Sequence, residues 1–253
     1  MFISNANVTE RKDLGHNIVL LKLFSPEIAS RINPGEFLNI KVSENSFPLL
    51  RRPFSVCDVE DESIYIMFHI AGEGTRLIAS KQIGGALDII GPLGKGFNFD
   101  DDFETAVFIA GGIGAAPFPY LKKKLNGKRI RSFIGGRSKE SIIEYGFENI
   151  QIATDDGSRG FHGNVVQLFK NEYPNIQNEK IKLFACGPTP MLKAIQEFAL
   201  EQNINCEIST ECAMACGFGI CQGCPIESTK NENQYSLVCK DGPVFNAKDV
   251  VLK

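Results

Sequence analysis

Four cysteines near the C-terminus are the residues whose type and spacing most directly indicate chemistry. Four residues separate Cys216 from Cys221, two separate Cys221 from Cys224, and Cys239 follows at a distance. This C-x4-C-x2-C spacing with a distant fourth cysteine is the plant-type pattern in which thiolates hold a [2Fe–2S] cluster. Glycines between these cysteines allow the backbone to wrap closely around an inorganic core. The sequence therefore predicts an iron–sulfur centre in the tail.

Two other readings of these cysteines are a structural zinc ion and a set of disulfides. Zinc sites usually pair two short C-x2-C knuckles, whereas here two unequal spacings overlap and the fourth cysteine stands alone. Disulfides are typical of small secreted domains, and no signal peptide is visible. Cys212 breaks the ligand spacing and is interpreted as a spectator or packing residue. Cys57 and Cys206 lie in apolar, strand-like runs and are predicted core residues.

Composition limits the classes of function that remain. The chain has 253 residues, is 43% hydrophobic and carries a formal net charge of −3. This length accommodates two domains and a small appendage. The charge does not indicate nucleic-acid binding, and no stretch approaches the roughly 20 apolar residues of a membrane span. A cytoplasmic protein with reduced cysteines, without a nucleic-acid or membrane partner, is expected.

The elements that must position the cysteines change in kind along the chain. Residues 1–99 contain strand-length runs separated by turn residues, with one helical stretch over 75–81, which predicts a sandwich or barrel. After residue 102 strands alternate with helices, which predicts a parallel sheet with right-handed crossovers. The expected strands are 105–110, 130–134, 150–154, 182–186 and 206–210. We expect domains at 1–99, 100–210 and 211–253.

Three short motifs could hold phosphorylated cofactors. Arg52 in Arg51-Arg-Pro-Phe-Ser-Val56 is a candidate phosphate donor, and Ser55 adds a hydroxyl. The run 110–117, Ala-Gly-Gly-Ile-Gly-Ala-Ala-Pro, follows a strand and opens a helix, where backbone N–H groups can bind a pyrophosphate. It is not a strict G-x-G-x-x-G, so tight strand–helix packing is an alternative. The run 185–191, Ala-Cys-Gly-Pro-Thr-Pro-Met, stands at another strand's carboxyl end, where open α/β sheets bind ligands.

In this order the motifs resemble the ferredoxin–NADP reductase superfamily. The tail from Met214 to Cys224, together with Cys239-Lys-Asp-Gly-Pro-Val-Phe245, looks like that of the electron-transfer subunits of type 1B dihydroorotate dehydrogenases. The runs 48–55, 72–77 and 91–97 look like the same subunits, so the resemblance extends nearly from end to end. It implies an N-terminal antiparallel β-barrel that binds FAD, a central Rossmann-like α/β domain that binds NAD, and a small C-terminal [2Fe–2S] domain.

The resemblance also assigns residues to cofactors. The implied cluster ligands are Cys216, Cys221, Cys224 and Cys239. The implied FAD contacts are Arg52, Pro53, Phe54, Ser55, Phe68, His69, Ile70, Gly74 and Thr75. The motifs expected beside the nicotinamide contain Gly111, Gly112, Gly114, Cys186, Gly187 and Pro188. No catalytic acid or base is expected, although Cys186 could lie near the flavin–nicotinamide stack or be simply a buried strand-end cysteine.

The function implied by the resemblance is an electron relay in pyrimidine (UMP) biosynthesis. Electrons from dihydroorotate, oxidised by a separate FMN-containing catalytic subunit, would pass through the cluster and FAD to NAD+. The implied assembly is a heterotetramer with two copies of each subunit. Arg137 after the second sheet strand would favour NADP, whereas Asp155 and Asp156 could accept hydrogen bonds from ribose or cap a turn.

Two rival functions remain open on the sequence. One is the small subunit of a related flavin and iron–sulfur oxidoreductase, such as a sulfide dehydrogenase or an NADH-dependent ferredoxin:NADP oxidoreductase. The other is a metal-stabilised binding module without redox turnover. The colour of the purified protein would separate an enzyme with flavin and cluster from a colourless zinc protein.

Overall fold

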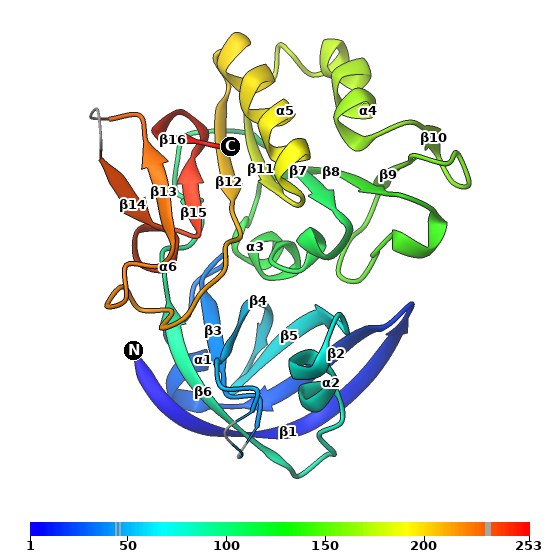
Figure 1. Ribbon diagram of the computed structural model, residues 1–253. Helices are drawn as coiled ribbons and strands as arrows, with labels where there is room; N and C mark the ends of the chain where they lie inside the picture. Colours follow the sequence, from blue (N-terminus) through cyan, green and yellow to red (C-terminus); the bar gives the residue numbers. More distant parts are fainter. Residues whose placement is uncertain (44, 46, 231–233) are drawn as a thin grey trace.

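The computed structural model describes residues 1–43, 45, 47–230 and 234–253. A barrel, an open sheet with helices and a small tail are arranged around a common junction (Figure 1). Among the described residues, no helix has the length and apolar character that crossing a membrane requires.

The N-terminal part is a closed barrel in which every neighbouring pair of strands is antiparallel, in the order β1-β2-β5-β4-β3-β6. Alternate side chains of its strands point inward, so that Leu38 and Ile40 of β3 are fully buried in the barrel core. The strands are β1 (Phe2–Gly15), β2 (Ile18–Phe24), β3 (Phe37–Ile40), β4 (Arg52–Glu60), β5 (Ser63–His69) and β6 (Ala86–Leu93), with the short helices α1 (Pro26–Ala29) and α2 (Glu73–Ala79).

The central part is a seven-stranded sheet in the order β10-β9-β8-β7-β11-β12-β15, and its edge strand β15 (Val244–Asn246) comes from the tail. All neighbours from β10 to β12 are parallel, as the alternation of strands and helices predicts. The strands are β7 (Thr105–Gly111), β8 (Arg129–Gly136), β9 (Ile150–Thr154), β10 (Phe161–His162), β11 (Ile181–Cys186) and β12 (Asn205–Ser209), and the helices are α3 (Phe118–Lys124), α4 (Val165–Glu172) and α5 (Thr189–Glu201). Short 3-10 turns lie at Gly112–Ala115, Lys139–Ser141 and Tyr173–Asn175.

The order of these strands fixes where a ligand can bind. The strands β8 and β9 follow β7 on one side, and β11 and β12 lie on its other side. The strand order therefore reverses between β7 and β11, and a crevice opens at their carboxyl ends. Helices α4 and α5 lie together on one face of the sheet, and α3 lies on the face toward the barrel (Figure 1).

The tail builds its own small sheet and also completes the central one. Its sheet has the order β14-β13-β16, formed by β13 (Pro225–Ser228), β14 (Tyr235–Leu237) and β16 (Val250–Val251). The short helix α6 (Val238–Asp241) follows β14, and a 3-10 turn at Ala247–Asp249 precedes β16. Strand β15 (Val244–Asn246) instead pairs antiparallel with β12 at the edge of the central sheet. The segment 211–253 is thus hydrogen-bonded into the α/β part, which its sequence does not indicate.

A buried ionic cluster fixes the crossover segment, residues 94–104, which links the barrel to the sheet. Lys182, at the start of β11, is fully buried; its ammonium lies 3.2 Å from Glu207 and also pairs with Asp101 of the crossover. Its Nζ donates to the carbonyl oxygen of Asn98 at 2.6 Å. Because a buried charge requires partners, this lysine holds the crossover segment against the sheet.

Candidate functional site

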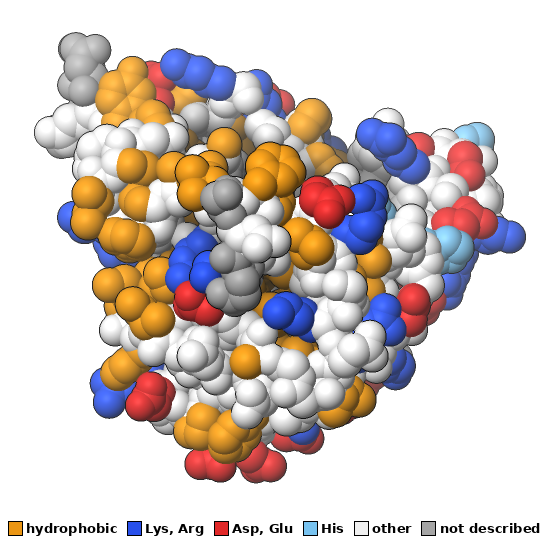
Figure 2. Space-filling model, turned by 60° about the horizontal axis from the view of Figure 1, so that its bottom comes forward, with side chains coloured by type: hydrophobic (Ala, Val, Ile, Leu, Met, Phe, Trp, Pro, Cys, Tyr) orange, Lys and Arg blue, Asp and Glu red, His pale blue; other side chains and the backbone are white. Residues whose placement is uncertain are grey.

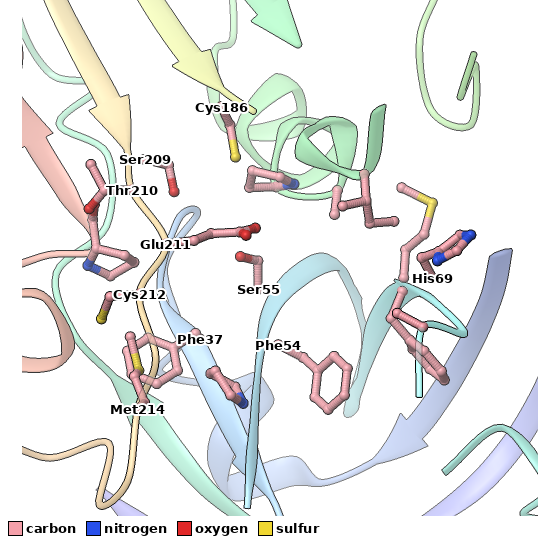
Figure 3. Close-up of a pocket in the computed structure, with 18 of the residues that line it drawn as sticks. Phe37, Phe54, Ser55, His69, Cys186, Ser209, Thr210, Glu211, Cys212 and Met214 are labelled. Atoms are coloured by element: carbon pink, nitrogen blue, oxygen red, sulfur yellow. The ribbon is translucent and has the colours of Figure 1, made fainter. Parts of the chain in front are cut away.

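A first cavity of about 290 Å³ lies where the barrel, the sheet and the tail meet. Figure 3 shows side chains from all three parts pointing into it. Barrel residues supply one wall, sheet residues the second, and the start of the tail the third. The lining residues include Phe37, Pro53, Phe54, Ser55, Met67, Phe68, His69 and Thr75 from the barrel part, Ile113, Pro117, Cys186, Ser209 and Thr210 from the sheet part, and Glu211, Cys212 and Met214 from the tail.

The barrel wall of this cavity is aromatic. The rings of Phe54 and Phe68 lie 5.1 Å apart at 58°, a tilted geometry that aromatic pairs favour. Both side chains are almost completely buried even though they border the cavity. The hydroxyl of Ser55 points into the same space (Figure 3). An apolar wall with a few polar groups is the usual construction of a cofactor pocket.

Six of the nine residues expected to contact flavin line this cavity, whereas Arg52, Ile70 and Gly74 do not. Arg52 donates to the carbonyl oxygen of Leu50 at 2.8 Å, and a Cβ on Gly74 would lie only 3.2 Å from its Nε. The guanidinium therefore stands beside the first turn of α2. Ile70 follows the end of β5 and packs against the barrel core.

Helix α2 begins two residues before the sequence suggests. It starts at Glu73, after the N-cap Gly72, and Thr75 is its third residue. The hydroxyl of Thr75 accepts hydrogen bonds from the backbone N–H groups of Ala71 (2.9 Å) and Gly72 (3.1 Å). Thr75 thus shapes the turn that borders the cavity, and the expected helix over 75–81 corresponds to 73–79.

A second cavity, of about 510 Å³, opens at the carboxyl ends of β7, β8 and β11. Backbone forms much of its wall. Its lining includes Gly111, Gly112, Gly114, Gly135, Gly136, Gly187 and Pro188. Five of the six residues expected beside the nicotinamide are therefore here, and the sixth, Cys186, borders the first cavity.

The glycines of this wall meet steric demands that no other residue satisfies. A Cβ on Gly114 would stand 2.2 Å from the carbonyl oxygen of Cys186, and one on Gly111 would stand 2.8 Å from the Met191 sulfur. The loops after β7 and β11 therefore pack backbone to backbone. Gly112 differs, because its φ is +53° and the space around its missing side chain is open.

The far end of the second cavity carries charges of both signs. Arg137 and Asp155 both line it, and the N–H of Asp155 donates to the carbonyl oxygen of Gly136 at 3.1 Å. The neighbouring Asp156 instead accepts from the backbone N–H of Ser158 at 2.9 Å. Of the two candidate ribose contacts, only Asp155 therefore faces the cavity, and Asp156 caps a turn.

Two residues belong to the walls of both cavities. Ile113 follows β7 and Glu211 follows β12. The Glu211 side chain is exposed because the cavities open onto it, yet the surrounding protein desolvates its carboxyl group and raises its pKa. Burial raises the pKa of the Cys186 thiol to about 12, and the charge of Glu211 adds to this effect. Sequence reasoning missed Glu211 because it belongs to no motif.

The four cysteines of the tail come together as two pairs of thiols. The backbone N–H of Cys221 points at Cys216 Sγ at 3.5 Å. The sulfurs of Cys224 and Cys239 lie 3.1 Å apart, and the N–H of Cys239 points at Cys224 Sγ at 3.5 Å. Cys224 and Cys239 are buried, whereas Cys221 is exposed.

The two pairs of thiols correspond to the ligands of a dinuclear cluster. All eight cysteines are free thiols. A [2Fe–2S] cluster takes four thiolates for two irons, which matches two pairs. Cys212 is half-buried, borders the first cavity and contacts the Cys224 thiol. Burial, together with the neighbouring Cys224 thiol, raises the pKa of Cys212 to about 11.

The backbone around Cys216 favours a thiolate. Burial opposes ionisation of its thiol, but the N–H groups of Cys221 and Phe218 outweigh this effect and lower its pKa to about 6. Gly217 and Gly219, with φ of +81° and +90°, give the loop the left-handed turns that aim these groups inward. The thiolate is the form that binds metals.

An antiparallel barrel followed by a parallel sheet, with a cavity between them, is the architecture of the ferredoxin–NADP reductase fold. The structure superposes on that of an NADH-dependent reduced ferredoxin–NADP oxidoreductase with a TM-score of 0.87 and 23% identity, covering 98% of this chain and 90% of that one. It also matches a ferredoxin NADP+ reductase from Neisseria gonorrhoeae with a TM-score of 0.66 and 18% identity, over 79% of this chain and 91% of the other. At these identities the likeness shows the fold, and it confirms the predicted fold class.

Sequence relatives define the particular family. Residues 211–251 match the model of the iron–sulfur cluster binding domain of dihydroorotate dehydrogenase B. The dihydroorotate dehydrogenase B (NAD+) electron transfer subunit of Geobacillus thermodenitrificans is 36% identical over 255 residues, 97% of each chain. That of Caldanaerobacter subterraneus subsp. tengcongensis is 36% identical over 222 residues, 87% of each chain. The chain belongs to this family of electron transfer subunits, as its motifs predict.

Proposed function

We propose that this chain carries electrons from a thiol-bound [2Fe–2S] cluster through FAD to NAD+, as the electron transfer subunit of an NAD-linked dihydroorotate dehydrogenase. The observation that carries this proposal is the continuity of the three sites. Glu211 and Ile113 wall both cavities, and Cys212 of the first cavity contacts the candidate ligand Cys224. The names of the relatives support the same function, which we propose to be part of pyrimidine biosynthesis.

The four paired cysteines, Cys216, Cys221, Cys224 and Cys239, would hold the cluster. FAD would occupy the first cavity, with Pro53, Phe54 and Ser55 against the flavin and Arg52 near its phosphates. The nicotinamide cofactor would enter the second cavity, where the glycine wall allows close approach to backbone. The proposed domains remain 1–99, 100–210 and 211–253, with β15 as the element that crosses back to the sheet.

The chemistry requires each of these groups and no general base. When bound, the cluster exchanges single electrons, the nicotinamide exchanges a hydride, and the flavin does both. The chain's own residues bind and orient these groups. Phe54 and Phe68 exclude water from one side of the first cavity, and the Cys186 thiol stays protonated at neutral pH because its pKa is about 12.

A division of labour between subunits tests the proposal. The purified chain should oxidise NADH with an artificial electron acceptor and should not oxidise dihydroorotate alone. Dihydroorotate-dependent reduction of NAD+ should appear only when the catalytic subunit is added. A chain that binds zinc and no flavin, or that oxidises dihydroorotate by itself, would show the proposal to be wrong.

The name electron transfer subunit implies a catalytic partner, which we propose to be an FMN-containing subunit in an assembly of two copies of each. The loop from Cys216 to Cys221 is the proposed docking element. Ile220 is 77% exposed, whereas Phe218 is half-buried and packs against the core. Of these two apolar residues, only Ile220 therefore offers an outward contact to a partner. Figure 2 shows groups of hydrophobic side chains on the face of the molecule that it presents.

Replacing Ile220 with Asp should weaken the complex, because an exposed apolar residue next to the cluster would lose its partner contact and acquire a charge. The matched control is Ile3→Asp, since Ile3 of β1 is 73% exposed. The affinity of the two subunits is measured by calorimetry. Equal affinities for the two variants would exclude this loop as the interface.

A further inference from the structure

The barrel strand β3 contains a single polar residue, and that residue contacts the cluster-binding loop. Asn39 is 1% exposed, between the buried apolar residues Leu38 and Ile40. Its Nδ2 donates to the carbonyl oxygen of Cys216 at 3.0 Å, across 177 positions of sequence. This bond joins the barrel directly to the first candidate cluster ligand.

The second amide atom of Asn39 makes this placement costly. Its Oδ1 is buried and has no hydrogen-bond partner among the described residues. A buried carbonyl oxygen without a partner destabilises a fold, and an apolar side chain would avoid the cost. An amide is therefore not the residue that stability alone would select at this position of β3.

The contact is also close in shape. Gly217, with φ of +81°, lies so near that a Cβ on it would stand 2.5 Å from Asn39 Nδ2. The side chain thus packs on the Cys216–Gly217 peptide as well as bonding to it. Beyond this peptide, the N–H groups of Phe218, Ile220 and Cys221 approach Cys216 Sγ. Fixing the peptide fixes the direction in which the following N–H groups point.

The same strand borders the first cavity, where we propose that FAD binds. Because side chains alternate along a strand, Phe37 and Asn39 lie on one face of β3, opposite Leu38 and Ile40 in the barrel core. Phe37 lines the first cavity and belongs to the apolar cluster that contains Cys224 and Cys239. Of the two outward-facing residues of β3, Phe37 therefore lines the first cavity and Asn39 contacts the Cys216–Cys221 loop.

We propose that Asn39 is a positioning residue for the iron–sulfur centre. Its hydrogen bond holds the Cys216–Cys221 loop on the strand that lines the flavin cavity, in the conformation that aims backbone N–H groups at Cys216 Sγ. Hydrogen bonds to cluster sulfurs stabilise the more negative, reduced cluster and raise its potential. This inference rests on the proposed ligand role of Cys216.

The test uses the full chain purified with its cofactors and two substitutions. Asn39→Leu removes the amide at similar size, and Asn39→Asp keeps the shape but places a carboxylate against the Cys216 carbonyl. The control Asn7→Asp adds the same charge at an exposed position of β1 in the same barrel. Redox titration followed by electron paramagnetic resonance gives the cluster potential, and visible circular dichroism reports its surroundings.

At the wild-type midpoint potential, the reduced-to-oxidised ratio of the cluster in Asn39→Leu should fall about tenfold, a shift of about −59 mV for one electron. Asn39→Asp should shift further in the same direction because of its charge, and Asn7→Asp should not shift. Loss of iron from Asn39→Leu with FAD content and Tm retained would also support the proposal.

Two results would overturn the proposal. One is an unchanged potential and circular dichroism spectrum in Asn39→Leu with the cluster retained. The other is a joint loss of FAD, iron and thermal stability, which would make Asn39 a general structural residue. The ligand assignment fails separately, if Cys216→Ser keeps its iron and its native spectrum.

Discussion

The two ends of the site are built from different materials. At the thiol end, four cysteine side chains form two pairs, Cys216 with Cys221 and Cys224 with Cys239. At the second cavity, the wall is largely backbone, and its glycines matter because they have no side chain to fill the space. A permanent inorganic group needs covalent ligands, whereas a cofactor that enters and leaves needs space and N–H groups. Substitutions at the thiol end should therefore act by removing a ligand atom. Substitutions at the second cavity should act by adding side-chain atoms to the wall.

The largest effect is expected at the thiol end. Cys221→Ser should remove or destabilise the cluster, because one iron would lose a thiolate ligand. Cys212→Ser should leave it intact, although Cys212 lies beside Cys224. Iron content and the visible absorbance of the two purified variants provide the measurement. An equal loss of iron from both would contradict the assignment of ligands.

Between the two ends, FAD retention should depend on one charged contact. Arg52→Ala should weaken FAD binding by about 1.5–3 kcal/mol, the usual worth of a hydrogen bond to a charged group, which is roughly a 10- to 150-fold loss of affinity. Arg129→Ala, in the α/β part, is the control. Flavin stoichiometry after dialysis is measured, and full retention in Arg52→Ala would count against a phosphate role.

Adding a methyl group to the glycine wall of the second cavity should weaken NADH binding without affecting FAD binding. Gly112→Ala places a Cβ in the open space of the second cavity, so the KM for NADH should rise about tenfold, or 1.4 kcal/mol. Its positive φ also costs about 1–2 kcal/mol of stability. Gly127→Ala is the matched control, because Gly127 has a φ of +76° and open surroundings outside the cavity lining. If both variants raise KM equally, backbone strain and not the cavity is responsible.

The smallest effect concerns the choice of nicotinamide cofactor. Asp155 faces the cavity and would repel a 2′-phosphate, so Asp155→Asn should improve kcat/KM for NADPH roughly fivefold, a gain of about 1 kcal/mol. Asp156→Asn should not, because the Asp156 carboxylate caps a turn. Steady-state rates with NADH and NADPH decide the question. If Asp155→Asn leaves the selectivity unchanged, Arg137 or backbone groups must distinguish NADH from NADPH.

The sequence predicts the parts of this molecule whose signals are local. The cysteine spacing indicates a cluster, and alternating strands and helices indicate the sheet. The pattern of β1 does not by itself indicate a strand, because most of its 14 residues are polar or exposed and only Ala6 and Val8 are buried. The sequence pattern predicts the start of helix α2 two residues late, because Gly72, not Thr75, is its N-cap.

Contacts between distant segments could not be predicted in this way. The bond from Asn39 to Cys216 spans 177 positions, and nothing in the pattern of β3 marks its asparagine as special. Glu211 borders two cavities only because β12 ends where the barrel meets the sheet. Such placements depend on the packing of the whole chain, which local periodicity does not describe.

The pairing of β15 with β12 has a consequence for protein engineering. A chain cut after Thr210 would lose the iron–sulfur segment, but it would also expose the ladder of N–H and C=O groups on β12 that β15 covers. Uncovered edge strands pair with other copies and promote aggregation. A two-cofactor version of this reductase is therefore better made by replacing thiols one at a time than by truncation.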